Sequence, residues 1–468
     1  MIGTLSPRPA IDADHWQRRL AALADRYRVP GAALGILRLR PDGDDELVQV
    51  AHGVLNKDTG VAATPDSLFQ IGSITKVWTA TVAMRLVDEG ELELDAPVLD
   101  VLPELRLADS DATKRVTLRH LLTHTSGIDG DLFLDTGRGD DCLGRFVARL
   151  EEAAQTHPLG ATWSYCNAGF SLLGRMIERL TGETWDRAMR ERLFEPLGLA
   201  RTVTLPEEAL LYRTAVGHVG EEAGEPYRAS AWVLPRSTGP AGLITAAVGD
   251  VLAFARLHLA GGLAPDGTRL LRETTVATMT EKHADLPDPH TLGDSWGLGW
   301  IRFTWDDRWL VGHDGNTIGQ SAFLRVCPDE GLAVALLTNG GHTRDLYQEL
   351  YRELFAELAA IAMPHPLGPP PEPVSVDMTP FVGTYERAGA RIEVVVDGGE
   401  PTLRATVTGP LAVLVSEPTK QFRLVAVTEN LFVVRAPKAE SWMPVTFHAL
   451  PSGERYVHFG ARATPKLG

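Results

Sequence analysis

The stretch Ser73–Asp88 reads SITKVWTATVAMRLVD, and it is preceded by Gly72 and followed by Glu89 and Gly90. Its composition and the glycine at its end predict a helix over these residues. The first turn of that helix holds a serine and a lysine three positions apart, which places both side chains on one face. We therefore start from Ser73 and Lys76 as a candidate nucleophile and its base.

A serine hydroxyl becomes a nucleophile only when a base lies beside it, and a lysine serves when its pKa is depressed. Lowering a lysine pKa from about 10.4 to about 7 costs on the order of 4–5 kcal/mol. Only a site whose surroundings stabilise the neutral amine would keep a lysine at such a pKa. The start of a helix also supplies backbone N–H groups and positive potential near the serine oxygen. Taken alone, the motif is equally compatible with an N-cap serine beside a surface lysine.

The segments on either side of this helix predict an α/β domain. An amphipathic helix is expected over residues 14–27, with strands following at 31–39 and 47–53. Further helices are expected at 117–122, 167–180 and 247–259, and three strands near the far end at 309–312, 320–327 and 332–337, followed by a helix at 344–361. Strands at both ends with helices between them indicate a sheet built from the two ends of the chain.

The last hundred residues have a different pattern. Residues 364–376 carry six prolines and are expected to form a stiff linker. Short β-type runs then recur, at residues 391–396, 402–407, 411–415, 422–427, 431–434, 444–449 and 455–459. This spacing predicts a small antiparallel barrel or sandwich. We divide the chain into a catalytic domain (1–363), a linker (364–376) and a β-barrel domain (377–468).

Composition narrows the classes of function. The 468 residues include 45 Lys and Arg against 61 Asp and Glu, a formal charge of −16, which disfavours nucleic acid and anionic membranes as partners. Three cysteines (Cys142, Cys166 and Cys327) are too few for a disulfide framework. Met1–Ile11 shows no secretory pattern, and no apolar run approaches the roughly 20 residues of a membrane span. We expect a cytoplasmic protein.

Two further clusters carry polar groups suited to catalysis. In Tyr165-Cys166-Asn167, the alternation of an extended segment lets Tyr165 and Asn167 point to the same side, where a phenol relays protons and an amide binds a substrate carbonyl. A core tyrosine and a helix-capping asparagine remain the alternative.

The other cluster is His313-Asp314-Gly315-Asn316. Gly315 allows a substrate backbone to approach closely. The N–H groups of Asn316 and Ser73 are candidates for an oxyanion hole, and His313 for orienting the substrate or stabilising charge. The alternative is a turn with His313 as an ordinary turn residue.

Together the three clusters resemble the serine β-lactamase and penicillin-binding-protein superfamily, whose signature is S-x-x-K, [SY]-x-N and K-T-G. The stretches RHLLTHTSG (119–127), PAGLIT (240–245) and LAVALLTNGG (332–341) resemble it too, so the resemblance covers about residues 12–362. It implies the roles of the site residues: Ser73 as the acylated nucleophile, Lys76 and Tyr165 as the acid–base pair, Asn167 as a substrate-amide ligand, and Gly315 and Asn316 in the substrate-binding strand.

Two departures from that signature refine the resemblance. Tyr-x-Asn is similar to class C β-lactamases and D,D-peptidases. His313 stands where K-T-G has its lysine, as in esterases and D-aminopeptidases of the superfamily, and this argues against efficient β-lactamase activity because the β-lactam carboxylate loses a permanent cation.

A smaller group matches more of the chain. It resembles the penicillin-binding-protein-type thioesterases, which are cytoplasmic, carry a C-terminal lipocalin-like barrel, and cyclise a peptidyl thioester, typically ending in a D-residue, from a nonribosomal peptide synthetase. The segment 130–142 is similar, although its acidic cluster also fits a solvated face. FGAR (459–462) resembles the C-terminus of that group, so Arg462 either binds a carboxylate or peptide carbonyl or is a barrel surface residue.

The resemblance thus implies an acyl-serine enzyme that releases a head-to-tail cyclic peptide, with a peptidyl thioester or ester, free or bound to a carrier protein, as its substrate. A cytoplasmic serine esterase or D-amino-acid peptidase and a catalytically silent binding protein are the alternatives. No metal is expected, because no histidine or cysteine cluster has ligand spacing. No nucleotide cofactor is expected either, because no Gly-rich phosphate loop follows a strand.

Overall fold

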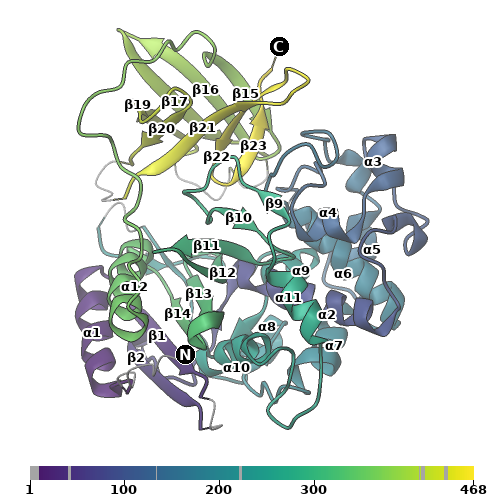
Figure 1. Ribbon diagram of the computed structural model, residues 1–468, viewed down its shortest axis with the longest axis vertical. Coiled ribbons are helices and arrows are strands. Elements are labelled where there is room, and N and C mark those ends of the chain that lie inside the picture. The colour runs from purple at the N-terminus through teal and green to yellow at the C-terminus, as the bar shows by residue number, and fades with distance from the viewer. Residues whose placement is uncertain are drawn as a thin grey trace, which may run out of the picture.

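The computed structural model describes residues 10–40, 44–132, 134–220, 224–409, 412, 417–436 and 441–467. The chain forms a large α/β domain and a small β domain, which lie one above the other in Figure 1. Residues 364–376 connect them and contain no helix or strand. The fold class predicted from the sequence is confirmed.

A nine-stranded antiparallel sheet forms the centre of the large domain, in the order β3-β2-β1-β14-β13-β12-β11-β10-β9. β1 (Gly31–Arg38) pairs with β2 (Glu46–Asn56) on one side and β14 (Leu332–Thr338) on the other. The two ends of the chain therefore meet in the middle of the sheet, as predicted. The remaining strands are β3 (Val61–Ala62), β9 (Ala284–Asp285), β10 (Ser295–Trp296), β11 (Ile301–Trp305), β12 (Arg308–Asn316) and β13 (Ser321–Cys327).

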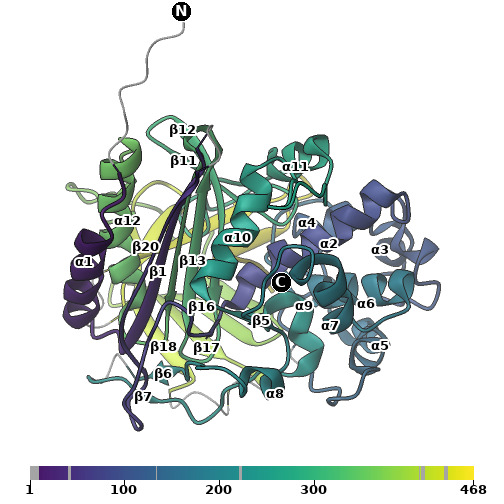
Figure 2. The ribbon, with the colours of Figure 1, turned by 90° about the horizontal axis from the view of Figure 1, so that it is seen from below.

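Helices cover both faces of this sheet. Every residue of β1 is buried, which is typical of a strand covered on both sides. α1 (Ala13–Arg26) and α12 (Thr343–Ala359) lie on one face and α10 (Val248–Leu259) on the other, as Figure 2 shows. Arg19 of α1 donates hydrogen bonds to two glutamates of α12, which joins the outer helices to each other.

A helical region fills the other side of the domain. Its central helix, α2 (Thr75–Glu89), is buried around most of its circumference and ends at Gly90, which adopts a left-handed conformation that favours glycine. The predicted helix thus begins as a 3₁₀ turn, η1 (Gly72–Ile74), before α2. The other helices are α3 (Ser110–Arg115), α4 (Leu118–Leu122), α5 (Cys142–Val147), α6 (Asn167–Thr181), α7 (Trp185–Met189), α8 (Pro206–Ala209), α9 (Gly239–Gly242) and α11 (Glu273–Thr280). In the described ranges, none is long and apolar enough to cross a bilayer.

The small domain is an antiparallel β barrel. Its strands follow one another in the order β15-β16-β17-β18 and β19-β20-β21-β22-β23. β18 and β19 are separated by one residue, and a backbone hydrogen bond from Leu467 to Thr384 closes β23 onto β15. The strands are β15 (Gly383–Arg387), β16 (Ala390–Asp397), β17 (Glu400–Val407), β18 (Thr419–Arg423), β19 (Val425–Ala426), β20 (Leu431–Val434), β21 (Met443–Ala449), β22 (Arg455–Phe459) and β23 (Arg462–Pro465).

Side chains fill the interior of the barrel. Among the described residues of this domain, eleven buried side chains form its core, including Tyr385, Phe432 and Phe447. The predicted strand at 411–415 lies almost wholly outside the described residues. The interior of the barrel is therefore occupied by side chains.

The packing of α12 on the sheet leads to a first prediction. Leu354 of α12 is completely buried, so Leu354→Ala is expected to lower the free energy of unfolding by about 2–5 kcal/mol. Leu210 is 84% exposed, and Leu210→Ala is expected to cost less than about 0.5 kcal/mol. Urea unfolding followed by tryptophan fluorescence measures both, and equal losses would contradict the described core.

Candidate active site

Ser73 and Lys76 lie at the junction of η1 and α2, where the sequence places them on one face. The Nζ atom of Lys76 is 3.1 Å from the Ser73 hydroxyl oxygen and 2.6 Å from the carbonyl oxygen of Ala241. The Lys76 side chain is fully buried, while Ser73 is partly exposed. A buried amine therefore contacts a hydroxyl that substrates can reach.

The surroundings of Lys76 favour its neutral form. No carboxylate among the described residues forms an ion pair with it, and the rings of Tyr165 and Phe170 lie 4.8 and 5.6 Å from Nζ. Burial lowers the pKa of Lys76 well below its ordinary value, and the positive charge of Arg462 lowers it further. A neutral Lys76 is able to accept the proton of Ser73.

Tyr165 and Asn167 flank the start of α6, as predicted. Burial raises the pKa of Tyr165, and the nearby Ser73 hydroxyl opposes that shift. The Tyr165 phenol is therefore protonated near neutral pH, and its oxygen makes no well-aligned hydrogen bond within the described ranges. Between the two residues, Cys166 is buried and accepts a hydrogen bond from the Gly169 amide, so it caps α6 as a packed thiol.

The backbone around Ser73 contacts the end of β12 directly. A Cβ atom on Gly315 would lie 1.9 Å from the Ile71 carbonyl oxygen and 2.9 Å from the Ser73 nitrogen. Gly72 adopts a φ of +52°, and a Cβ there would lie 2.5 Å from the Asn316 nitrogen. The glycines thus let the Ser73 and Asn316 segments come together without side chains between them.

His313 is buried behind this contact. Its Nδ1 atom lies 2.6 Å from the Asp314 carbonyl oxygen, which only accepts, so Nδ1 carries the proton and Nε2 is left as an acceptor. Nε2 has no hydrogen-bond partner among the described residues. Burial lowers the pKa of His313 to about 3, so the ring is neutral and does not act as a cation near pH 7.

The adjacent residue, Asp314, is a buried carboxylate with two cationic partners. It lies 2.6 Å from Arg325 and 2.9 Å from Arg344. Burial alone would raise the pKa of Asp314, but the two arginines outweigh it and the pKa is lowered. Its charge is therefore neutralised within the protein.

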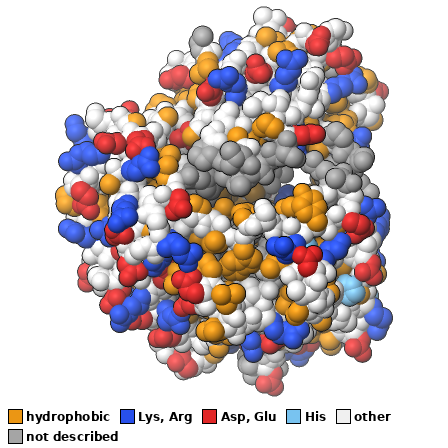
Figure 3. All heavy atoms as spheres, turned by 180° about the vertical axis from the view of Figure 1, so that it is seen from behind, with side chains coloured by type: hydrophobic (Ala, Val, Ile, Leu, Met, Phe, Trp, Pro, Cys, Tyr) orange, Lys and Arg blue, Asp and Glu red, His pale blue; other side chains and the backbone are white. Residues whose placement is uncertain are grey.

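These residues face a cavity of about 620 Å³ between the two domains. Figure 3 shows a hollow between the barrel and the larger domain, with hydrophobic side chains gathered below it. Six of the predicted site residues line the cavity, namely Ser73, Tyr165, Asn167, His313, Asn316 and Arg462. The linker and the barrel supply further wall residues: Pro366, Leu367, Trp442, Met443, Pro444 and Phe459. A volume of this size is typical of sites that enclose most of a drug-sized ligand.

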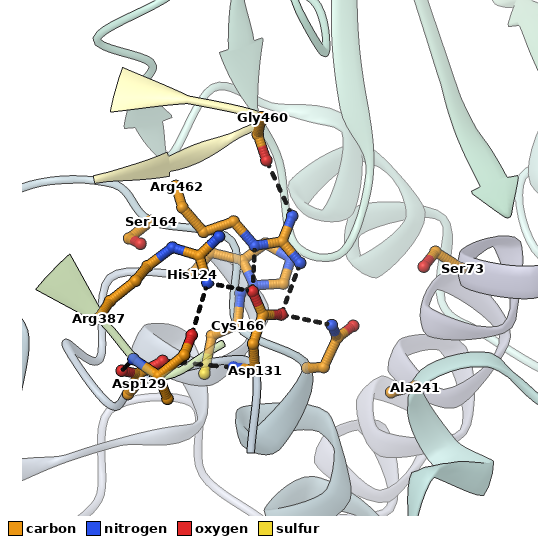
Figure 4. Close-up of polar contacts among 12 residues, drawn as sticks. Ser73, His124, Asp129, Asp131, Ser164, Cys166, Ala241, Arg387, Gly460 and Arg462 are labelled. Carbon is orange, nitrogen blue, oxygen red and sulfur yellow. Dashed lines mark hydrogen bonds and ion pairs between the residues drawn. The ribbon is translucent and has the colours of Figure 1, made fainter. Parts of the chain in front are cut away.

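Arg462 reaches the cavity from the first position of β23. It forms a two-pronged pair with Asp131, with Nη2 2.8 Å from Oδ1 and Nε 3.1 Å from Oδ2 (Figure 4). Asp131 also accepts hydrogen bonds from Arg387 of β15 and from Asn167. Burial alone would raise the pKa of Asp131, but Arg462 and Arg387 outweigh it and lower the pKa to about 2. We call these three residues, Asp131, Arg387 and Arg462, the interdomain clamp.

The structure thus brings all eight predicted site residues to one place. Lys76 and Gly315 are not in the cavity wall, but both contact the Ser73 segment. Sequence reasoning missed Asp131, Arg387, Arg344 and the wall residues of the barrel. Asp131 lies in the acidic segment 130–142 noted above, but nothing in the sequence pairs it with an arginine 331 residues away. No group of three metal-ligating side chains occurs in the described part of the chain.

Comparison with known proteins agrees with this geometry. A family described as Beta-lactamase matches residues 16–358. A protein named penicillin-binding protein 4 from Amycolatopsis lactamdurans is 49% identical over 380 residues, covering 81% of this chain and 98% of its own. Esterase EstB from Burkholderia gladioli is 28% identical over 366 residues, covering 70% of this chain and 92% of its own.

A solved structure matches both domains. The crystal structure of SurE superposes with a TM-score of 0.79 at 29% identity and covers 97% of this chain and 99% of its own; a second structure of SurE, with D-Leu, gives a TM-score of 0.77. The penicillin-binding protein homologue from Pyrococcus abyssi shares the fold, with a TM-score of 0.61 and 22% identity, over 97% of this chain and 100% of its own. The family match spans most of the chain, and its Ser-x-x-Lys, Tyr-x-Asn and His-x-Gly residues meet at one cavity. The protein belongs to the serine β-lactamase and penicillin-binding-protein family.

Proposed function

We propose that the protein transfers the acyl group of a peptidyl thioester to Ser73 and releases it as a head-to-tail cyclic peptide. The observation that carries this proposal is the 3.1 Å contact between Ser73 and a buried Lys76, at a cavity that both domains line. The contact supplies the acyl-serine chemistry, and the enclosed cavity supplies a place to fold the peptide back on itself.

The first half-reaction forms the acyl-enzyme. The Ser73 oxygen attacks the thioester carbon while its proton passes to Lys76. The negative charge of the tetrahedral intermediate lies against the N–H groups of Ser73 and Asn316, where the backbone segments meet. The carbon–sulfur bond then breaks, and the thiolate takes a proton from Lys76 through Tyr165, which leaves an ester on Ser73.

The second half-reaction decides the product. The free amine at the peptide's own N-terminus attacks the ester carbon, and Tyr165 and Lys76 carry its proton to the departing Ser73 oxygen. An amide bond forms, the ester bond breaks, and the product is a cyclic peptide. Attack by water gives the linear acid instead. Apolar walls from the linker and barrel, including Leu367, Trp442 and Met443, favour the amine because they reduce the water near the ester.

The remaining predicted residues take supporting roles in this proposal. Asn167 donates to the substrate's peptide carbonyl, and Arg462 and the neutral His313 line the same cavity. The substrate is presented on a carrier protein of a nonribosomal peptide synthetase. The match to SurE over both domains, with a structure of that protein containing D-Leu, supports a D-configured residue at the acyl end.

Hydrolysis is the second candidate, and the relationship to an esterase supports it. The same acyl-enzyme, resolved by water, makes the protein a serine esterase or a D-amino-acid peptidase. A silent binding protein is disfavoured, because burying an amine against a hydroxyl is costly. In a protein that only binds, a neutral side chain would serve better at this position.

Product mass separates these candidates. Wild type and Ser73→Ala are incubated with a short peptidyl thioester that ends in a D-residue, and the products are weighed by mass spectrometry. We expect a product lighter than the linear acid by one water from wild type, and none above background from Ser73→Ala, because the acyl-enzyme cannot form. If wild type gives only the linear acid, the reaction is hydrolysis and not cyclisation. If Ser73→Ala gives the same yield as wild type, Ser73 is not the nucleophile.

The backbone contact at Ser73 leads to a second prediction. Gly315→Ala places a methyl group 1.9 Å from the Ile71 carbonyl oxygen, so β12 must move away from Ser73 and the paired N–H groups separate. Removing one donor of an oxyanion hole costs about 10²–10³-fold in turnover, and we expect a loss of that size. Gly144→Ala is the control, because a Cβ there meets its nearest neighbours at 3.6 Å. Equal turnover in the two variants would contradict the proposed oxyanion hole.

A further inference from the structure

Two basic side chains lie close to the Tyr165 ring. The Lys76 Nζ atom is 4.8 Å from the ring centre, and the Arg462 Cζ atom is 4.9 Å from it. We propose that Arg462 is a positioning residue that acts on Ser73 and Lys76 through the Tyr165 ring, and that Asp131 sets how much of its positive charge reaches them. This inference deepens the proposed function and rests on it.

The backbone of the barrel fixes Arg462 over the ring. The Tyr165 amide donates to the Ala461 carbonyl oxygen at 3.0 Å, and the Ala463 amide donates to the Ser164 hydroxyl at 3.2 Å. These two bonds flank Arg462 on both sides in sequence. The guanidinium is therefore held at the ring by the backbone on either side of it, and a cation over an aromatic face is itself a stabilising arrangement.

Asp131 limits the charge that Arg462 presents. Both arginines of the interdomain clamp contact the single carboxylate of Asp131, so the clamp carries a net positive charge beside Tyr165. The nearby Asp129 accepts a hydrogen bond from the Ala388 amide, and burial raises its pKa. Removing Arg462 would leave this end of the cavity more negative, and removing the charge of Asp131 would leave it more positive.

The other titratable groups that face Tyr165 and Lys76 are neutral or paired. Burial lowers the pKa of His124 and His313 and raises the pKa of the Cys166 thiol to about 11, so all three are uncharged near neutral pH. Asp314 is neutralised by its two arginines. Burial has the largest effect on the pKa of Lys76, and Arg462 and Asp131 act on it in opposite directions: Arg462 lowers the pKa and Asp131 raises it.

The test measures how fast a fluorophosphonate labels Ser73 at different pH values. This small probe reports activation of the serine without needing the peptide. The rate rises with pH as Lys76 loses its proton, and a neighbouring charge moves such a midpoint by about one pH unit. We expect Arg462→Gln to move the midpoint up by about one unit and Asp131→Asn to move it down by a similar amount.

Two further variants separate charge from structure. Arg462→Lys keeps the charge, so its midpoint is expected to stay near that of wild type. Arg387→Gln removes the other arginine of the interdomain clamp, which makes no contact with the Tyr165 ring among the described residues, and we expect its midpoint to change much less than that of Arg462→Gln. Thermal unfolding of each variant shows whether it is folded, and opposite shifts in two folded variants do not arise from loss of structure.

The outcomes are distinct. A lower rate with an unchanged midpoint in Arg462→Gln and Asp131→Asn would overturn the inference and leave a structural clamp. An unchanged labelling profile with a raised KM for the peptidyl thioester would make Arg462 a substrate ligand only, which also overturns it. Absence of Ser73 labelling in wild type at every pH would overturn the proposed function itself, and the inference with it.

Discussion

Lys76 carries an amino group into the interior without a carboxylate partner among the described residues, and the site depends on that arrangement. Burying an ammonium ion is costly, so burial lowers the pKa of Lys76 well below its ordinary value and favours the neutral amine beside Ser73. Two features hold it there: α2, buried on most sides, and the Ala241 carbonyl oxygen that accepts from Nζ.

The second domain is part of the same arrangement. The core of the barrel is filled, and its rim contacts the site: Ala461 and Ala463 hydrogen-bond to the Tyr165 segment, and Arg462 covers the Tyr165 ring. The match to SurE extends over both domains, as expected if the barrel and the α/β domain work together. The site is therefore shared by the two domains and is not confined to the β-lactamase-like part.

Most of the site could be predicted from the sequence because its polar residues occur in short motifs. Ser73 and Lys76 are three residues apart on a helix, and Tyr165 and Asn167 are separated by a single buried cysteine, so local geometry alone brings each pair together. The long helices and the central strands were predicted for the same reason, since their apolar patterns are continuous. β15 and β23 were not, because GTYER and RATP are short and partly polar, and they become strands only by pairing with their neighbours.

Contacts between distant segments were beyond the reach of such reasoning. Asp131 and Arg462 are 331 residues apart, and each alone looks like a surface charge. His313 was predicted as a group that orients the substrate or stabilises charge, but burial among Tyr165 and Trp296 makes it neutral, so charge stabilisation as a cation is corrected to the role of an acceptor. These properties follow from tertiary packing, which no local pattern records.

The central claim is that Lys76 is an uncharged base near neutral pH, and its titration tests that claim most directly. The chain has seven lysines, so ¹³C labelling of the lysine side chains gives few NMR signals, and Lys76→Arg identifies the signal of interest. The account predicts that this signal titrates well below the ordinary lysine value of 10.5 and separately from the signals of the surface lysines. Titration of Lys76 at the ordinary lysine value would contradict it.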